Sequence, residues 1–260
     1  MRKNALFVSA AAFILGIAGF VTRTIELSIG YEPDTGLPIH SSAVVNTMIW
    51  LSLIVILLAG ALGVLLRHNY TSKRTYGAAF APAKMSYFLF TVVLGVLWLA
   101  ATVAHAFIAY TSGAPTTQDL AYSILSVLAA VSVMMLGHNA FTGRAGSAML
   151  FFSLVPEVFL TLWLVILFSV NQTNPVLLSY SYQGLAIASS ALGFFFVAGY
   201  VYGKPGPGKL SFSLVCAIFF NAVALADRTP LPTRAIFAVM LVFHSVSLVR
   251  FLLRLEKNEL

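Results

Sequence analysis

Charged side chains are scarce in this sequence, and acidic ones are the scarcest. Of 260 residues, 9% are charged, only 8 are Asp or Glu, and 60% are hydrophobic. Soluble globular domains usually carry about 25% charged residues, so the composition excludes an ordinary soluble enzyme or binding domain. No polar segment is long enough to fold as a separate catalytic domain. We therefore expect one integral membrane domain over residues 1–260.

Cysteine is almost absent as well. Cys216 is the only one, so no intramolecular disulfide can form, and one thiol within an apolar stretch says nothing about the redox compartment. The stretch 203–209 fits the phosphate-binding pattern G-x-x-x-x-G-K, but Leu210 occupies the Ser/Thr position and two prolines remove amide donors. This pattern predicts a cytoplasmic turn.

Other membrane chemistries lack their motifs too. The sequence has no H-E-x-x-H zinc motif, no pair of intramembrane aspartates and no lysine in the last apolar stretch for a Schiff base. Ser153 and Ser245 are the best nucleophile candidates, yet such serines can bond their own helix backbone. We expect no enzymatic activity, no cofactor and no metal.

Long apolar stretches are what the sequence does contain. A helix needs about 20 apolar residues to cross the hydrocarbon core. That criterion predicts an all-α polytopic transmembrane helix bundle of about eight spans, near 5–22, 43–66, 85–110, 120–137, 148–170, 180–202, 210–226 and 235–254. The fourth and seventh stretches are short, so either is a candidate for a tilted or re-entrant segment. The first follows basic residues, as in a secretory signal, but lacks a small-x-small cleavage site, so we expect an uncleaved helix.

Basic residues set the expected orientation, since Lys and Arg are retained on the cytoplasmic side. In the eight-span arrangement, Arg23, Arg228 and Arg234 fall on one side. The other twelve fall opposite: Arg2, Lys3, Arg67, Lys73, Arg74, Lys84, Arg144, Lys204, Lys209, Arg250, Arg254 and Lys257. This asymmetry predicts that the N-terminus and C-terminus are both cytoplasmic, in a protein of the plasma (cytoplasmic) membrane.

The formal charge of +7 indicates partners of opposite charge. The basic residues lie at span ends and do not alternate with stacking aromatics, which favours anionic lipid headgroups on the cytoplasmic face over nucleic acid. Small residues spaced four apart, such as Ala12 with Gly16, Ala59 with Gly63 and Gly184 with Ala188, predict close helix contacts. These contacts lie within the bundle, or against a second copy or another membrane protein.

Pro156 and Glu157 are the sharpest local feature. Pro156 is the only proline in the middle of a span and predicts a kink, and Glu157 is the only acidic residue deep inside one. Ionisable groups at that depth mark pathways, proton relays or partner contacts, or else a neutral acid that locks packing. His244 lies at an equal predicted depth, so it is a candidate proton-exchange partner or a hydrogen-bonded core group.

Polar residues also gather on the predicted outer side. The loop 22–42 is the longest, and the alternation over residues 24–29 fits a short strand or a helix extension. A candidate outer vestibule comprises Arg23, Glu26, Glu32, Asp34, His40, His105, Asp227 and Arg228. The simpler interpretation is a solvated lid with ordinary ion pairs. A metal site from Glu32, Asp34 and His40 fits no established ligand spacing.

Two functions remain open. The first is small-solute or ion transport of a permease-like kind, with Glu157 exposed to an interior path on a kinked helix. The second is a non-catalytic sensor or scaffold subunit that docks a partner. No motif in the sequence identifies a substrate.

Overall fold

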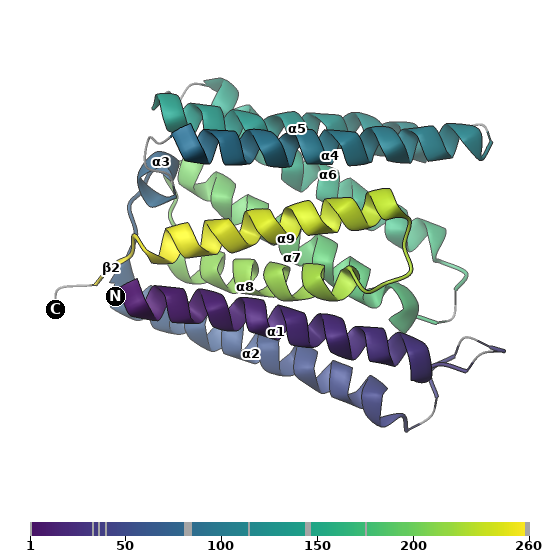
Figure 1. Cartoon of the computed structure of the whole chain (residues 1–260). Helices are drawn as coiled ribbons and strands as arrows, with labels where there is room; N and C mark the ends of the chain where they lie inside the picture. Colours follow the sequence, from purple (N-terminus) through teal and green to yellow (C-terminus); the bar gives the residue numbers. More distant parts are fainter. Residues whose placement is uncertain are drawn as a thin grey trace.

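The computed structural model describes residues 2–32, 34–35, 37–39, 41–80, 85–113, 115–143, 147–174 and 176–257, with side chains from residue 5 onward except at 147 (Figure 1). Over these residues the chain is almost entirely helical. The elements are α1 (Arg2–Ile29), α2 (Ala43–Asn69), β1 (Tyr70–Thr71), α3 (Tyr76–Ala79), α4 (Met85–Thr111), α5 (Thr117–Thr142), α6 (Ser147–Val170), α7 (Leu178–Val201), α8 (Pro207–Ala224), α9 (Leu231–Leu252) and β2 (Glu256–Lys257).

Eight helices of the described chain are long and apolar enough to cross a membrane, which confirms the predicted multi-pass bundle. The fourth apolar stretch lies within a longer helix, because α5 extends over 26 residues and its polar ends continue the helix beyond the apolar run. The first helix likewise continues seven residues past position 22, to Ile29. Of the two alternatives for residues 24–29, the helix extension is the one that forms.

Helix α8 lies at the centre of the bundle. It packs against α1, α2, α7 and α9, and 83% of its residues are buried. Helices α4 and α5 form a pair on the side opposite α1 and α2, at the top of the view in Figure 1. The seventh apolar stretch is therefore enclosed mainly by other helices of the bundle.

Small residues let α1 and α2 approach α8 closely. A Cβ placed on Gly16 would lie 3.2 Å from the Ala222 Cβ, and one on Gly63 would lie 2.8 Å from the Gly208 carbonyl oxygen. The third predicted pair faces α6, since Gly184 lies against Leu167. All three small-residue pairs therefore mark contacts inside the bundle, as backbone approach requires in lipid.

The two ends of the chain lie at one end of the bundle. Ala5, Tyr70 and Leu252 line a common cavity there, and β1 pairs with β2 in antiparallel register. We call this the terminal end and the opposite one the distal end. An even number of spans fits this arrangement, and cytoplasmic exposure of the terminal end stays a prediction.

Helix α6 is continuous through Pro156. The proline removes one backbone donor from the helix ladder.

Candidate functional site

A buried charged cluster at the distal end is built around Arg23. The side chain is 0% exposed, and all three guanidinium nitrogens are engaged. Nε donates to Asp227 Oδ1 at 2.8 Å, Nη2 donates to the Leu178 carbonyl at 3.2 Å, and the Tyr182 ring lies 4.7 Å from Cζ. This is the forked and stacked geometry for which arginine is better suited than lysine.

The remaining nitrogen, Nη1, faces the carboxyl end of α1. It lies 3.0 Å from Glu26 Oε2, one helical turn away, and donates to the Tyr31 hydroxyl at 3.0 Å. Tyr31 in turn donates to Glu26 Oε1 at 3.2 Å. The cluster therefore joins α1, the segment after it, the start of α7 and the α8–α9 loop.

The prediction of a solvated lid is wrong for this cluster. Glu26 is 0% exposed and Asp227 is 2% exposed, so these ion pairs are enclosed by protein. The reason is the length of α1, because extension to Ile29 places Arg23 and Glu26 on a packed helix instead of in a loop. Tertiary packing of α7 and the α8–α9 loop completes the enclosure.

The cluster carries more acceptor capacity than it uses. Arg23 supplies one positive charge against two carboxylates. Glu26 Oε2 is held by the ion pair with Arg23, whereas Asp227 Oδ2 lacks a hydrogen bond among the described residues. Burial raises the pKa of Asp227 above its ordinary value, although the Arg23 guanidinium and the Gln183 side chain act in the opposite direction. Burial also raises the pKa of the Tyr31 hydroxyl. An unsatisfied buried acceptor is costly, and a ligand with N–H donors would remove that cost.

A cavity of about 550 Å³ borders Asp227 on the distal side. Its lining is rich in hydrogen-bonding side chains, and consists of Leu27, Ser28, Tyr31, Glu32, Ser179, Gln183, Asp227 and Arg228. That volume suits a small molecule. Tyr31, Tyr182 and Gln183 were not among the residues expected from the sequence, because nothing local distinguishes them from ordinary boundary residues.

The other residues of the predicted vestibule divide between two places. Glu32 and Arg228 line the same cavity, whereas Asp34 is exposed in a turn and is not among the lining residues. His40 lies outside the described residues. His105 does not join them, since it stacks on Tyr122 with ring centroids 4.5 Å apart and lies 4.0 Å from Asp119, on the α4–α5 side of the bundle.

Glu157 and His244 do not form the predicted pair. Both ring nitrogens of His244 lack a hydrogen-bond partner among the described residues, and the ring is enclosed by Phe194 and Phe243. A Cβ on Gly193 would lie 2.9 Å from the His244 ring. His244 is thus a core residue held by aromatic contacts, not by the hydrogen bond expected of a core histidine.

Glu157 is half-buried on α6, beside the exposed Val158. In the described part of the chain it makes no hydrogen bond or ion pair. It lies near the middle of α6 and does not border the distal cavity.

The candidate nucleophiles and one candidate metal ligand, Glu32, make ordinary structural hydrogen bonds. The Ser153 and Ser245 hydroxyls each donate to a carbonyl of their own helix, at 2.8 and 2.7 Å, as expected of structural serines. Over the described ranges, no three His, Cys, Asp or Glu side chains gather in a group that could hold a metal ion. Glu32 instead accepts a hydrogen bond from Thr35 at 2.7 Å.

The fold defines a multi-pass membrane protein with a buried charged cluster beside a distal cavity. Comparison with protein-family models, curated proteins and solved structures finds no match.

Proposed function

We propose that this chain is a small-solute-handling membrane protein, permease-like in kind, that binds a small cationic solute in the distal cavity. The observation that carries the proposal is the environment of Asp227. Its carboxyl group is buried, gives one oxygen to Arg23, and keeps the other without a hydrogen bond beside an open cavity. A protonated amine supplies the missing donor and the missing positive charge.

The lining supports an amine over an anion. Glu32 and Asp227 contribute two carboxyl groups, and Ser28, Ser179 and Gln183 add neutral polar groups. Arg228 is the one cation among the described residues of the lining, and its guanidinium donates to the Leu27 carbonyl at 3.5 Å. The cavity lining and the buried cluster together carry one net negative charge. Three carboxylates, those of Glu26, Glu32 and Asp227, face the two guanidinium groups of Arg23 and Arg228.

Proton competition follows from the same geometry. Because burial raises the pKa of Asp227, a proton and a cationic ligand compete for one carboxylate. Ligand affinity should increase as pH rises through the Asp227 pKa, and binding should release a proton. A proton gradient across the membrane would then bias uptake or release of the solute.

The first experiment measures binding. The purified protein in lipid nanodiscs is heated with a panel of small amines, including methylammonium and a linear diamine, and with matched small carboxylates. We expect at least one amine and no carboxylate to raise the melting temperature, and Asp227→Asn to abolish that rise. Arg228→Gln is the matched control, because it alters the same lining without removing an acceptor. If no amine acts, or if Asp227→Asn responds as the wild type does, the proposal is wrong.

The second experiment measures movement. Proteoliposomes that contain the protein are tested for uptake of the amine that binds, with and without a proton gradient, in the wild type and in Glu157→Gln. Gradient-dependent uptake supports transport. Uptake that ignores the gradient and survives Glu157→Gln would remove the intramembrane carboxyl from the mechanism.

A second candidate function, a non-catalytic subunit, is favoured by Glu157. A carboxyl group at this depth costs about 2.5 kcal/mol or more when it faces lipid, and no described residue hydrogen-bonds it. A neighbouring transmembrane helix with a donor would remove that cost. Native mass spectrometry after mild solubilisation should then show a defined partner or a second copy that Glu157→Leu removes and Val158→Leu retains. A monomer in all three samples would contradict this function.

A further inference from the structure

Two connected cavities lie at the terminal end, far from the charged cluster. The larger, of about 640 Å³, opens between the end of α7 and the start of α8. The smaller, of about 340 Å³, continues along α2, α7 and α8. Arg67, Phe196, Gly208 and Lys209 line both, so the two form one continuous site.

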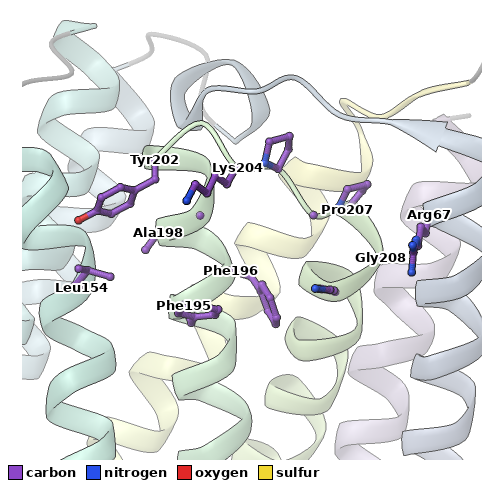
Figure 2. Close-up of a pocket in the computed structure, with 13 residues that line it drawn as sticks. Arg67, Leu154, Phe195, Phe196, Ala198, Tyr202, Lys204, Pro207 and Gly208 are labelled. Atoms are coloured by element: carbon purple, nitrogen blue, oxygen red, sulfur yellow. The ribbon is translucent and has the colours of Figure 1, made fainter.

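The larger cavity has a basic rim and an apolar floor. Figure 2 shows Lys204 above the cavity and Arg67 beside Gly208, with Phe195 and Phe196 below them. Arg67, Lys204 and Lys209 are exposed. In the described part of the chain none of the three makes an ion pair or a side-chain hydrogen bond.

No acidic side chain among the described residues lines either cavity. Glu256, the acidic side chain that the structure describes at this end, is engaged by Lys73 at 3.5 Å. Other cations at this end are occupied, since Arg250 lies 4.5 Å from the Tyr87 ring centroid and Arg254 donates to the Ala78 carbonyl at 2.7 Å. The three rim cations are thus a local excess of positive charge.

The start of α8 adds to that excess. Helix α8 begins at Pro207, and Gly206 has no side chain to accept a hydrogen bond from the first turn. The amides of a first helical turn lack intrahelical partners, and the helix dipole favours an anion there. The same turn 203–209 that only resembles a nucleotide-binding loop therefore presents amides and lysines to the larger cavity.

The smaller cavity is an apolar groove. Gly60, Gly63, Val64, Leu192 and Phe212 line it together with the shared residues. A Cβ on Gly60 would meet nothing within 4 Å, so the groove is open at this position. Gly63 and Gly208 keep α2 and α8 in contact at its inner wall.

We propose that this paired site binds one anionic phospholipid, with the phosphate headgroup among Arg67, Lys204 and Lys209 and one acyl chain in the groove beside Gly60. Charge complementarity selects an anionic headgroup, because a zwitterionic one brings its own cation to a rim whose described residues include no acidic side chain. The groove selects a lipid over a soluble anion, because only a lipid fills both cavities. A basic pocket between transmembrane helices is a recognised way to hold a lipid headgroup.

The headgroup side is tested by native mass spectrometry of the protein released from nanodiscs that contain equal amounts of phosphatidylglycerol and phosphatidylcholine. We expect one retained phosphatidylglycerol. One basic residue near a charged surface is worth about a fivefold change in affinity, so Lys204→Gln with Lys209→Gln should lower retention about 25-fold. Lys73→Gln, at the same end but away from both cavities, is the control. Equal retention of both lipids, or equal loss in the control, would overturn the proposal.

The groove side is tested with two substitutions on one helix. Gly60→Leu fills the open groove, whereas Ala61→Leu adds the same side chain at an exposed position. We expect Gly60→Leu alone to lose the bound lipid while both variants keep the wild-type melting temperature in lipid-free detergent. If sn-glycerol 1-phosphate raises the melting temperature as much as phosphatidylglycerol does, the site binds a soluble anion and the lipid proposal fails. Amine binding at the distal cavity is read separately, so the two proposals stand or fall independently.

Discussion

Replacement of Arg23 by leucine removes the one cation that the structure places between Glu26 and Asp227. Both carboxyl groups would stay buried without a counter-charge. Removal of one partner of a buried ion pair typically costs about 3–5 kcal/mol, because it leaves an uncompensated buried charge. We expect Arg23→Leu to lower the free energy of unfolding by about 4 kcal/mol at pH 7, since two carboxyl groups, a carbonyl and a hydroxyl lose a common donor.

A compensated variant separates this electrostatic cost from a loss of packing. In Arg23→Leu with Glu26→Leu and Asp227→Asn, no charge remains in the cluster, and well-packed neutral replacements of buried ion pairs are often neutral in stability. We expect the triple variant to recover most of the lost free energy. Arg23→Lys should recover little, because an ammonium cannot reproduce the forked bonds or the contact with the Tyr182 ring.

The assay is reversible unfolding in mixed micelles, in which the fraction of folded protein is measured as a function of denaturant concentration. Acidity gives a second readout, because burial raises the pKa of Asp227 and its protonation removes uncompensated charge, so the cost of Arg23→Leu should shrink as pH falls. A loss below about 1 kcal/mol at pH 7, or a triple variant no more stable than the single one, would refute the reasoning.

Three further predictions use the same structure. Between the ordinary carboxyl pKa of about 3.9 and the raised pKa of Asp227, the folded state binds more protons than the unfolded state. The melting temperature should therefore fall as pH rises through that window. Asp227→Asn should flatten the dependence of the melting temperature on pH. Gly63→Leu should destabilise by about 1–3 kcal/mol, because its Cβ meets the backbone of α8, whereas Gly60→Ala should change little in denaturant titrations. With the native Cys216 buried, an impermeant thiol reagent applied to intact cells should label Asp34→Cys and not Lys257→Cys, and the reverse pattern would invert the predicted orientation.

The sequence predicted the spans well because lipid imposes a simple requirement. A helix in hydrocarbon must satisfy its own backbone and present apolar side chains over a fixed thickness, and hydropathy along the chain records both. The errors occurred at the ends, at Ile29 in α1 and at Thr117 and Thr142 in α5. There the helix continues past the apolar run, because contacts with other helices and with capping groups stabilise it in place of lipid.

The candidate sites were predictable as residues but not as groupings. Arg23, Glu26 and Asp227 were all predicted as site residues. Arg23 and Asp227 are 204 residues apart in the sequence, so nothing in the sequence indicates that they form a hydrogen bond. Equal depth suggested that Glu157 and His244 could meet. Depth fixes one coordinate only, and rotation about each helix axis placed His244 against Phe194 instead.

The sequence by itself determined a multi-pass helical bundle, the positions of its spans and the excess of cations at their ends, because each depends on composition along one helix at a time. Only the tertiary structure decided that α8 is central, that Arg23 is enclosed and that three rim cations border an apolar groove. These depend on which faces of different helices meet. That choice is made by packing between segments far apart in the chain, where small residues such as Gly63 and Gly208 allow one approach and exclude others.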